Sequence, residues 1–323
     1  MPDKKNRSQT LDKLSIEPAS MKKRQLGRTA VRVSEIGLGC ASYWGKEKFA
    51  EKEAIHIVAK AIDQGVNLFD TGHSYSDGHA EIRLGKALAG IRDKSDIAVS
   101  TKAGTRIADN GRLYKDFSPR WIRESCHQSL SKIGVDSIAL FHLHGPTVGD
   151  LNPEVLEELR KLKAEGLIQS IGVNSFDDVV LKRILELDCF DFVMPDYNIL
   201  AREREPLIEM FHEKGIGVVA GAALADSLFS NRIFNIKSSK DLWYLARALK
   251  NFRGKLVKGF SYRFVNDSQE ITGPQIALAY ILRNQKVSSA VFGTTSEKHL
   301  MENIAAAQMR VPAEILNKIL ARP

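Results

Sequence analysis

The sequence predicts an α/β chain folded as a closed (β/α)8 TIM barrel, with an N-terminal β-hairpin and an elaborated loop after the seventh strand. Eight short apolar runs alternate with amphipathic segments, which is typical of parallel strands joined by right-handed helical crossovers. The runs are nearly continuous, as expected for strands buried on both faces. Eight units favour closure over an open, doubly wound sheet. Gly37-Leu38-Gly39 lacks the third glycine and the acidic partner of a dinucleotide-binding fingerprint, which disfavours the open sheet.

The elements follow one another regularly along the chain. The expected strands are Ile36–Gly39, Val66–Asp70, Ile97–Lys102, Ser137–Leu143, Ile168–Val173, Phe192–Tyr197, Ile216–Ala220 and Ser288–Phe292. The expected helices are Glu51–Gln64, His79–Leu88, Pro119–Ile133, Pro153–Glu165, Asp177–Leu187, Arg202–Lys214, Pro274–Arg283 and Ser296–Ala307. Ser118 and Asn152 are suitable N-caps for the third and fourth helices, and Gly134 and Gly166 are expected to end them.

Three segments lie outside this alternation. Lys22–Val33 is expected to form a hairpin around a turn at Leu26–Thr29. Residues 226–272 are expected to form the elaborated loop over the C-terminal end of the barrel, with a helix at Lys240–Asn251. Residues 1–21 are expected to form a flexible basic arm, and residues 22–323 the barrel domain. The first 24 residues carry seven Lys or Arg against three acids and no aromatic side chains, which predicts a solvated arm and no nucleic-acid partner.

The composition bounds the class of protein. The chain has 323 residues, of which 43% are hydrophobic and 27% charged, so it can form one large core and is not a disordered chain. Its cysteines (Cys40, Cys126 and Cys189) are few and widely spaced, which argues against a disulfide framework and fits a reducing compartment. We find no early apolar stretch like a signal peptide and no run of about 18 apolar residues that could span a membrane. We therefore expect a cytoplasmic protein with no membrane partner. Its oligomeric state stays open.

Four polar residues follow the second, third and fourth predicted strands: Asp70, Tyr75, Lys102 and His144. The C-terminal ends of parallel strands meet at one rim of a barrel, where active sites of this fold lie. An acid, a phenol, an amine and an imidazole would then share one pocket. Asp70 would pair with Lys102, and the Lys102 cation would stabilise a Tyr75 phenolate. This set of groups can move a proton onto or off a carbonyl oxygen that His144 orients.

The motifs around these residues resemble the aldo-keto reductases. They are Phe69-Asp70-Thr71 with Tyr75, Glu81 and Leu84-Gly85-Lys86-Ala87-Leu88, then Ser100-Thr101-Lys102, His144-Gly145-Pro146, Ile171-Gly172-Val173, and Gly293 with Glu302-Asn303. Arg24-Gln25-Leu26-Gly27-Arg28-Thr29 is similar to the hairpin at the bottom of that family's barrel. The resemblance runs from about residue 22 to the C-terminus.

That resemblance implies a nicotinamide cofactor bound without a Rossmann domain, and hydride transfer to or from a carbonyl carbon of a small aldehyde, ketone or sugar. It implies that Tyr75 is the general acid/base, Lys102 tunes it, Asp70 holds Lys102 and His144 orients the substrate. It implies NADP as the cofactor, with NAD as the alternative. The cofactor-binding residues that it implies are Gly39, Cys40, Asn174, Ser175, Met194, Gly221, Leu224, Gly293, Thr294, Thr295, Lys298, His299, Glu302 and Asn303.

The chain departs from the family pattern on the cofactor side. Asn174-Ser175 stands where the family usually has Ser-Asn, and Met194 aligns with its usual Gln. Ala220-Gly221-Ala222-Ala223-Leu224 carries no tyrosine to stack on the nicotinamide. His299, beside Lys298, aligns with the arginine that commonly binds the 2′-phosphate, and histidine is a weaker anion partner at neutral pH.

Two other functions remain open from the residues. The chain could be a non-catalytic, nucleotide-binding regulatory member of the same fold. His142 and His144 are spaced as the metal-binding imidazoles of barrel hydrolases are, although the other strand ends carry no obvious further ligands. The simpler interpretation is that His142 packs inward or bonds a neighbour, so we expect no metal. The residues specify neither the substrate nor the direction of the reaction.

Overall fold

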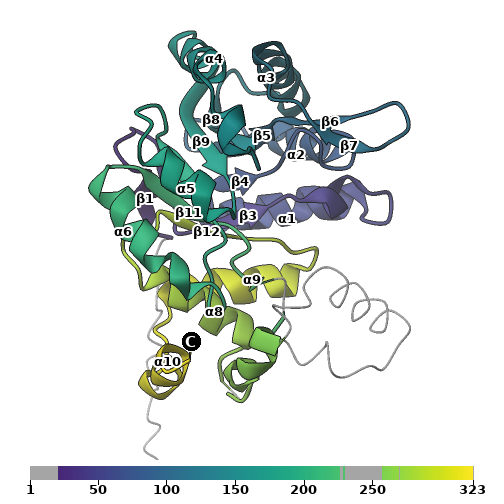
Figure 1. Cartoon of the computed structure of the whole chain (residues 1–323). Coiled ribbons are helices and arrows are strands. Elements are labelled where there is room, and N and C mark those ends of the chain that lie inside the picture. The colour runs from purple at the N-terminus through teal and green to yellow at the C-terminus, as the bar shows by residue number, and fades with distance from the viewer. Residues whose placement is uncertain (1–20, 226–227, 230–256, 269, 323) are drawn as a thin grey trace, which may run out of the picture.

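The computed structural model describes residues 21–225, 228–229, 257–268 and 270–322. Within these residues, eight parallel strands close into a barrel (Figure 1). In chain order they are β3 (Ile36–Gly39), β4 (Leu68–Asp70), β5 (Ala98–Ala103), β8 (Ile138–His144), β9 (Ile168–Asn174), β10 (Phe192–Met194), β11 (Gly217–Ala220) and β12 (Ser289–Phe292). Each strand pairs with the next, and β12 pairs with β3. The predicted closed (β/α)8 barrel is confirmed.

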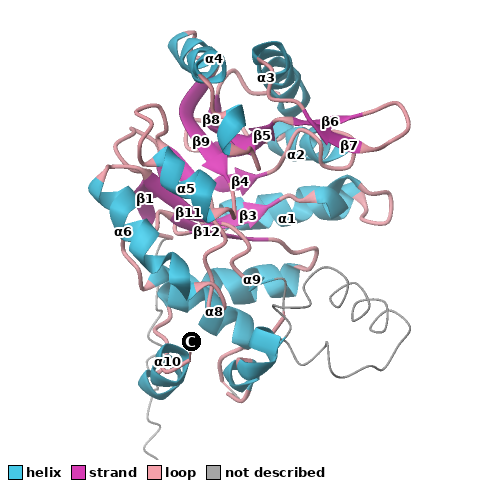
Figure 2. Ribbon diagram, viewed as in Figure 1, coloured by secondary structure: helices cyan, strands magenta, loops and turns pink. Residues whose placement is uncertain are grey.

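Helices surround the strands, and Figure 2 shows them as an outer layer. They are α1 (Glu51–Asp63), α2 (His79–Ala89), α3 (Pro119–Ile133), α4 (Pro153–Ala164), α5 (Asp178–Ile184), α6 (Glu205–Glu213), α8 (Gly273–Leu282), α9 (Glu297–Ala305) and α10 (Ala313–Leu320). The predicted caps are present, since Ser118 and Asn152 accept hydrogen bonds from main-chain N–H groups in the first turns of α3 and α4. Gly134 ends α3 in the left-handed conformation, with φ of 72°. None of the helices described is both long and apolar enough to cross a membrane.

The predicted N-terminal hairpin is confirmed as β1 (Lys23–Gln25) and β2 (Arg32–Ser34), which pair antiparallel. Its Arg24 guanidinium forms an ion pair with Glu35 and donates hydrogen bonds to three main-chain oxygens near the other end of the chain. These are the oxygens of Leu282, Asn284 and Val287, at 2.9, 3.0 and 2.7 Å. The hairpin therefore ties the start of the barrel to the segment that leads into its last strand.

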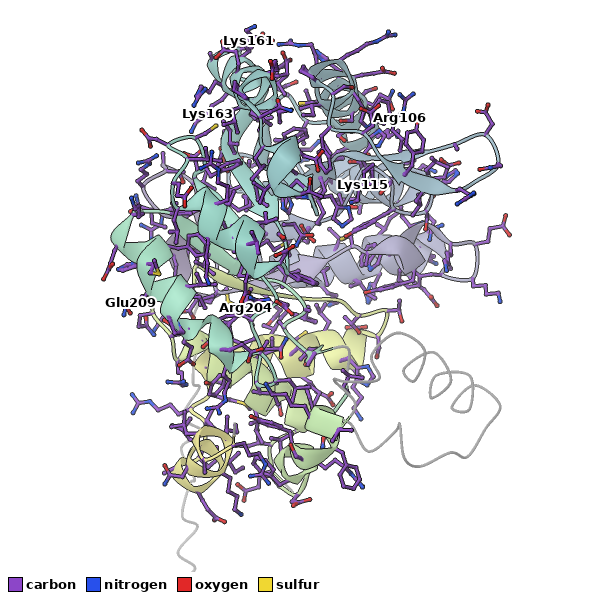
Figure 3. The ribbon with its side chains drawn as sticks, in the orientation of Figure 1. Arg106, Lys115, Lys161, Lys163, Arg204 and Glu209 are labelled. Carbon is purple, nitrogen blue, oxygen red and sulfur yellow. The ribbon has the colours of Figure 1, made fainter. Side chains whose placement is uncertain are left out.

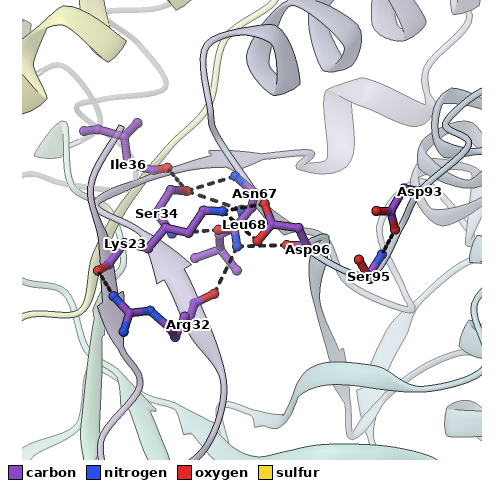
Figure 4. Close-up of polar contacts among 9 residues, drawn as sticks. All are labelled: Lys23, Arg32, Ser34, Ile36, Asn67, Leu68, Asp93, Ser95 and Asp96. Atoms are coloured by element: carbon purple, nitrogen blue, oxygen red, sulfur yellow. Dashed lines mark hydrogen bonds and ion pairs between the residues drawn. The ribbon is translucent and has the colours of Figure 1, made fainter. Parts of the chain in front are cut away.

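A buried polar junction joins the hairpin to the N-terminal end of β4 (Figure 4). The Asn67 side chain accepts a hydrogen bond from the Ser34 N–H (2.6 Å) and donates to the main-chain oxygens of Arg32 (3.0 Å) and Asp96 (2.9 Å). The Asp96 carboxylate also pairs with Lys23 (2.5 Å). Because these main-chain groups are satisfied, the hairpin can be buried against this end of the barrel.

Apolar side chains fill the lower interior of the barrel. One buried cluster combines hairpin residues with strand residues, among them Leu26, Val33, Leu68, Leu140, Phe192, Val219 and Val291. Gly172 makes room for an aromatic ring there, because a Cβ at this position would lie 2.3 Å from the Phe192 ring. The barrel interior at the hairpin end is therefore packed with apolar side chains.

Several element boundaries differ from the sequence prediction. The strand expected at Phe192–Tyr197 ends at Met194, because Pro195 has no N–H for the ladder. The helix expected at Arg202–Lys214 begins as a 3-10 turn, η3 (Arg202–Arg204), before α6.

The elements that were not predicted include α10 and a second hairpin, β6 (Thr105–Ile107) and β7 (Leu113–Lys115), which follows β5 directly. The strands of this hairpin are three residues each and carry a single aliphatic residue apiece, Ile107 and Leu113, so they give no apolar signal. The helix expected at Lys240–Asn251, most of the loop 226–272 and the arm 1–20 lie outside the described residues.

Candidate active site

The four polar side chains predicted at the rim come together at the C-terminal end of the barrel. Asp70 is the last residue of β4, Lys102 lies one residue before the end of β5, and His144 is the last residue of β8. Tyr75 lies in the loop after β4. The parallel register explains the first three positions, since β4 pairs with β5 and β5 with β8.

Lys102 and Asp70 form a buried ion pair. The Lys102 ammonium lies 2.7 Å from both carboxylate oxygens of Asp70 and donates a third hydrogen bond, of 2.6 Å, to the main-chain oxygen of Thr71. Burial removes both charged groups from water, which disfavours their charged forms, and the attraction between the two charges offsets that cost. Burial alone would raise the pKa of Asp70, and the Lys102 ammonium holds it well below its usual range. Burial alone would lower the pKa of Lys102, and Asp70 together with Tyr75 raises it.

The Tyr75 ring lies over this ion pair. The Lys102 Nζ is 5.2 Å from the centroid of the ring. The loop that carries the ring turns sharply, since Ser76, Asp77 and Gly78 have consecutive φ values of 50°, 58° and 80°. Left-handed backbone is costly for side-chain-bearing residues, so the surrounding structure must stabilise this loop conformation. The turn sets Tyr75 beside a permanent cation.

His144 faces Tyr75 as a neutral imidazole. The two rings meet edge to face, with centroids 5.9 Å apart and an interplanar angle of 83°. Burial, followed by the nearby Lys102 and Lys115 cations, lowers the pKa of His144 to about 3. A neutral imidazole carries one N–H, so it can donate a hydrogen bond to a substrate oxygen without adding charge.

A second buried network supports the carboxylate from the other side. Ser100 Oγ donates to Asp70 Oδ1 (2.7 Å) and lies 3.0 Å from His142 Nε2. Because the Ser100 proton is already donated, His142 Nε2–H must be the donor in the second contact. The alternation of side chains on β5 and β8 explains the network, since Ser100 and His142 precede Lys102 and His144 by two residues on the same faces. The sequence alone indicates no separate role for Ser100.

The two buried imidazoles predict that the folded state loses stability in acid. Burial is the main cause that lowers the pKa of His142, to about 4. In the unfolded chain the pKa of a histidine is about 6.5. When the pH falls below that value, the unfolded chain binds a proton at His142 that the folded chain excludes, so the free energy of unfolding falls. At pH 5 His142 alone should cost about 2 kcal/mol relative to pH 7.5. Denaturant unfolding at a series of pH values measures this loss.

A matched pair of variants isolates the effect of His142. His142→Gln should flatten the pH dependence of the unfolding free energy between pH 6.5 and 5. The exposed His127, on α3, serves as the control, and His127→Gln should leave that slope unchanged. Equal slopes for the wild type and His142→Gln would contradict a neutral buried His142.

The residues implied for the cofactor lie around the same end of the barrel. The last residues of three strands belong to this set: Gly39 of β3, Asn174 of β9 and Met194 of β10. Others follow a strand, namely Cys40 after β3, Ser175 after β9, Gly221 and Leu224 after β11, and Gly293, Thr294 and Thr295 after β12. The remaining four lie on α9: Lys298, His299, Glu302 and Asn303. Asn174 Nδ2 donates to the Met194 main-chain oxygen (2.9 Å), so this amide is oriented by the neighbouring strand. Ser175 is buried, and its Oγ accepts from the Asp177 N–H (3.2 Å).

The turn before α9 suits an anionic group. Ser296 caps this helix by accepting from the His299 N–H, and Thr294 Oγ1 accepts from the Ser296 N–H (3.1 Å). Lys298 is largely exposed, with 79% of its side chain accessible and Glu302 3.7 Å away. A capped helix N-terminus with an exposed cation fits a phosphate, and so the residues present fit a nicotinamide dinucleotide.

Cys40 and the His-x-His pair have simple structural explanations. Cys40 is fully buried, and burial raises the pKa of its thiol well above the usual value, so it is not a thiolate. The His142 ring is engaged with Ser100 on its Nε2 side, as the simpler interpretation of the sequence expects. Among the residues the structure describes, no group of three or more His, Cys, Asp or Glu side chains could hold a metal ion.

Comparisons with known proteins agree with this geometry. The model of the aldo/keto reductase family matches residues 35–321. The chain is 31% identical over 296 residues to the uncharacterized oxidoreductase YqkF of Bacillus subtilis, covering 90% of this chain and 92% of YqkF. It is 27% identical to the NADH-specific methylglyoxal reductase of Escherichia coli, covering 90% and 95%. The holo form of aldo-keto reductase AKR11C1 from Bacillus halodurans superposes with a TM-score of 0.76 at 28% identity, covering 93% and 95%. The chain therefore belongs to the aldo/keto reductase family of oxidoreductases.

Proposed function

We propose that this protein transfers a hydride between a nicotinamide cofactor and the carbonyl or alcohol carbon of a small aldehyde, ketone or sugar, with Tyr75 as general acid/base. The observation that carries the proposal is the buried Lys102–Asp70 pair, whose ammonium lies 5.2 Å from the centre of the Tyr75 ring. Bound nicotinamide supplies the hydride, and the protein supplies orientation and the proton.

The side chains divide the proton chemistry between them. In reduction, the Tyr75 hydroxyl gives its proton to the carbonyl oxygen, and the Lys102 ammonium stabilises the phenolate that remains. Asp70 keeps that ammonium charged and fixed, because its carboxylate binds it in a bidentate manner. His144 donates a hydrogen bond to the same oxygen as a neutral group. In oxidation the same groups act in reverse, with the phenolate as base.

On the cofactor side, Asn174 and Ser175 are suited to the carboxamide, and the Gly293–Ser296 turn with Lys298 is suited to a phosphate. We propose NADP, with NAD as the alternative. The Escherichia coli relative is named as NADH-specific, which supports NAD as the alternative cofactor. The exposed Lys298 favours NADP, since it offers a charge that a 2′-phosphate could use.

Titration of the pure protein with NADPH and NADH tests the cofactor proposal. We expect saturable quenching of protein fluorescence or enhancement of cofactor fluorescence with both, and tighter binding of NADPH. Lys298→Met should weaken NADPH binding by about tenfold and leave NADH binding nearly unchanged, because one charge-assisted contact to a phosphate is lost. The exposed Lys318, on α10, supplies the control variant Lys318→Met.

The preferred cofactor is then used with a panel of aldehydes, ketones and sugars. Turnover of at least one carbonyl compound is expected. Tight cofactor binding with no turnover across the panel would instead favour the regulatory, non-catalytic alternative. Failure to bind either cofactor would contradict the proposal altogether. The three cysteines are unpaired and buried, which supports a reducing location such as the cytoplasm.

A further inference from the structure

The β6–β7 hairpin brings a lysine to the C-terminal rim of the barrel, beside His144. Lys115, the last residue of β7, donates a hydrogen bond to the main-chain oxygen of His144 and another, of 3.1 Å, to Thr105 Oγ1. Its ammonium lies 5.9 Å from the centre of the buried Phe117 ring. Figure 3 labels Lys115 together with Arg106 on the neighbouring strand of the hairpin. The cation is thus bonded to the main chain of His144, the residue whose imidazole faces Tyr75.

Two other charged groups near this hairpin already have partners. Arg106 pairs with Asp116 (3.1 Å) and stacks over the Trp121 ring at 4.2 Å. The Asp150 carboxylate accepts hydrogen bonds from the N–H and hydroxyl of Thr147, both at 2.7 Å.

Inside the pocket, Lys102 is neutralised by Asp70, and His144 is neutral. Both hydrogen-bond acceptors of the Lys115 ammonium are uncharged oxygens, and the Asp150 carboxylate attracts it only at longer range. Within the part of the chain that the structure describes, the Lys115 ammonium therefore has no directly bonded carboxylate.

We propose that Lys115 binds an anionic group of the substrate, so that the preferred substrates are aldehydes or ketones that carry a carboxylate or phosphate. This inference rests on the proposed function of the site. A bound substrate displaces water from the rim, and an ammonium that loses water needs an opposite charge. An anionic substrate supplies that charge, whereas a neutral substrate leaves the ammonium less well solvated. The site therefore selects for the anion both by attraction and by the cost of binding a neutral molecule.

Pairs of aldehydes that differ only in the anionic group test the inference. Suitable pairs are succinic semialdehyde with butanal, and 4-carboxybenzaldehyde with 4-methylbenzaldehyde; a phosphorylated aldehyde with its unphosphorylated parent separates phosphate from carboxylate. For each pair, the measured quantity is the ratio of kcat/KM for the charged compound to that for the neutral one. We expect a ratio above one for the wild type. Lys115→Met should lower it by about tenfold, mainly through KM, because a charge-assisted hydrogen bond is lost.

Two further variants separate recognition from structural support. Lys115→Arg keeps the charge and should keep most of the preference. Arg112 lies in the exposed turn of the same hairpin, and Arg112→Met should leave the ratio unchanged. A wild-type ratio of one or below, or the same ratio in Lys115→Met as in the wild type, would overturn the inference. A loss of the preference in Arg112→Met as well would point to general attraction by a basic surface and also overturn it.

Measuring the binding of carboxylates, without turnover, tests the anion site separately from the proposed function. Succinate and 4-carboxybenzyl alcohol are titrated by calorimetry into the cofactor-bound wild type and Lys115→Met, with benzyl alcohol as the neutral control. Binding of the carboxylates should be about tenfold weaker in the variant. If no aldehyde is turned over, the proposed function fails, and this titration still decides whether Lys115 binds anions. Equal carboxylate binding by both proteins would refute the anion site even if the enzyme is active.

Discussion

Replacing Tyr75 with Phe is expected to lower kcat by on the order of a thousandfold for every carbonyl substrate that the wild type reduces. The substitution removes one hydroxyl and keeps the ring that packs edge to face against His144, so the fold and the pocket shape should persist. Without that hydroxyl the carbonyl oxygen has no proton donor beside a cation, and the negative charge that develops on it is stabilised only by the neutral imidazole. Steady-state kinetics with the preferred cofactor measures the loss.

Cofactor titration of the same variant distinguishes lost chemistry from lost binding. Its dissociation constant for the cofactor should stay within about threefold of the wild-type value, since a change below 1 kcal/mol is expected when no cofactor contact is removed. Tyr114→Phe removes a hydroxyl from an exposed tyrosine on β7 and serves as the matched control. Turnover by Tyr75→Phe at a rate near that of the wild type would rule out Tyr75 as the proton donor.

Breaking the ion pair beneath Tyr75 is expected to have the largest effect on stability. Asp70→Asn keeps the shape of the side chain but leaves the Lys102 ammonium, whose side chain is 2% exposed, without a counter-charge. Loss of one partner of a buried pair costs about 3–5 kcal/mol, because the remaining charge stays desolvated. Lys102→Met should cost a similar amount for the reciprocal reason. Denaturant unfolding at neutral pH measures both.

The double variant shows whether the charges act as a pair. Asp70→Asn combined with Lys102→Met should be less destabilised than the sum of the single variants, by about 2 kcal/mol or more, because no buried charge remains. The exposed pair Lys318–Glu314 on α10 gives the comparison, and its coupling should stay below about 1 kcal/mol. Additive losses at Asp70 and Lys102 would mean that the two groups are stabilised independently of each other.

The strand–helix alternation was sufficient to predict the barrel, because each buried strand requires a continuous apolar run and each surface helix a periodic one. The same reasoning placed Asp70, Lys102 and His144 on one rim, since parallel strands end together. It could not reveal the β6–β7 hairpin, whose strands are only three residues long and are held by main-chain bonds around Asn110-Gly111. Lys115 was overlooked for that reason.

The sequence also does not specify which polar groups form hydrogen bonds with each other, or which of them donates. Nothing in the His-x-His spacing indicated that His142 would bond to Ser100, because that contact depends on the register between β5 and β8. Likewise, the resemblance placed Asn174 near the cofactor, but only the structure shows its amide donating to the Met194 main-chain oxygen. Which group donates and which accepts depends on residues that are far apart in the sequence and meet only in the folded chain.

The seam between β3 and β12 joins residues 36–39 to residues 289–292, and Arg24 bonds to main-chain oxygens between residues 282 and 287. During synthesis on the ribosome, β3 therefore cannot pair with β12 until residues 289–292 have been made. Until then, β3 and the most recently synthesised strand each present unpaired backbone groups to other chains. The loops that follow β4, β5 and β8 can form early, but the ring that supports them is completed only after β12 has been synthesised.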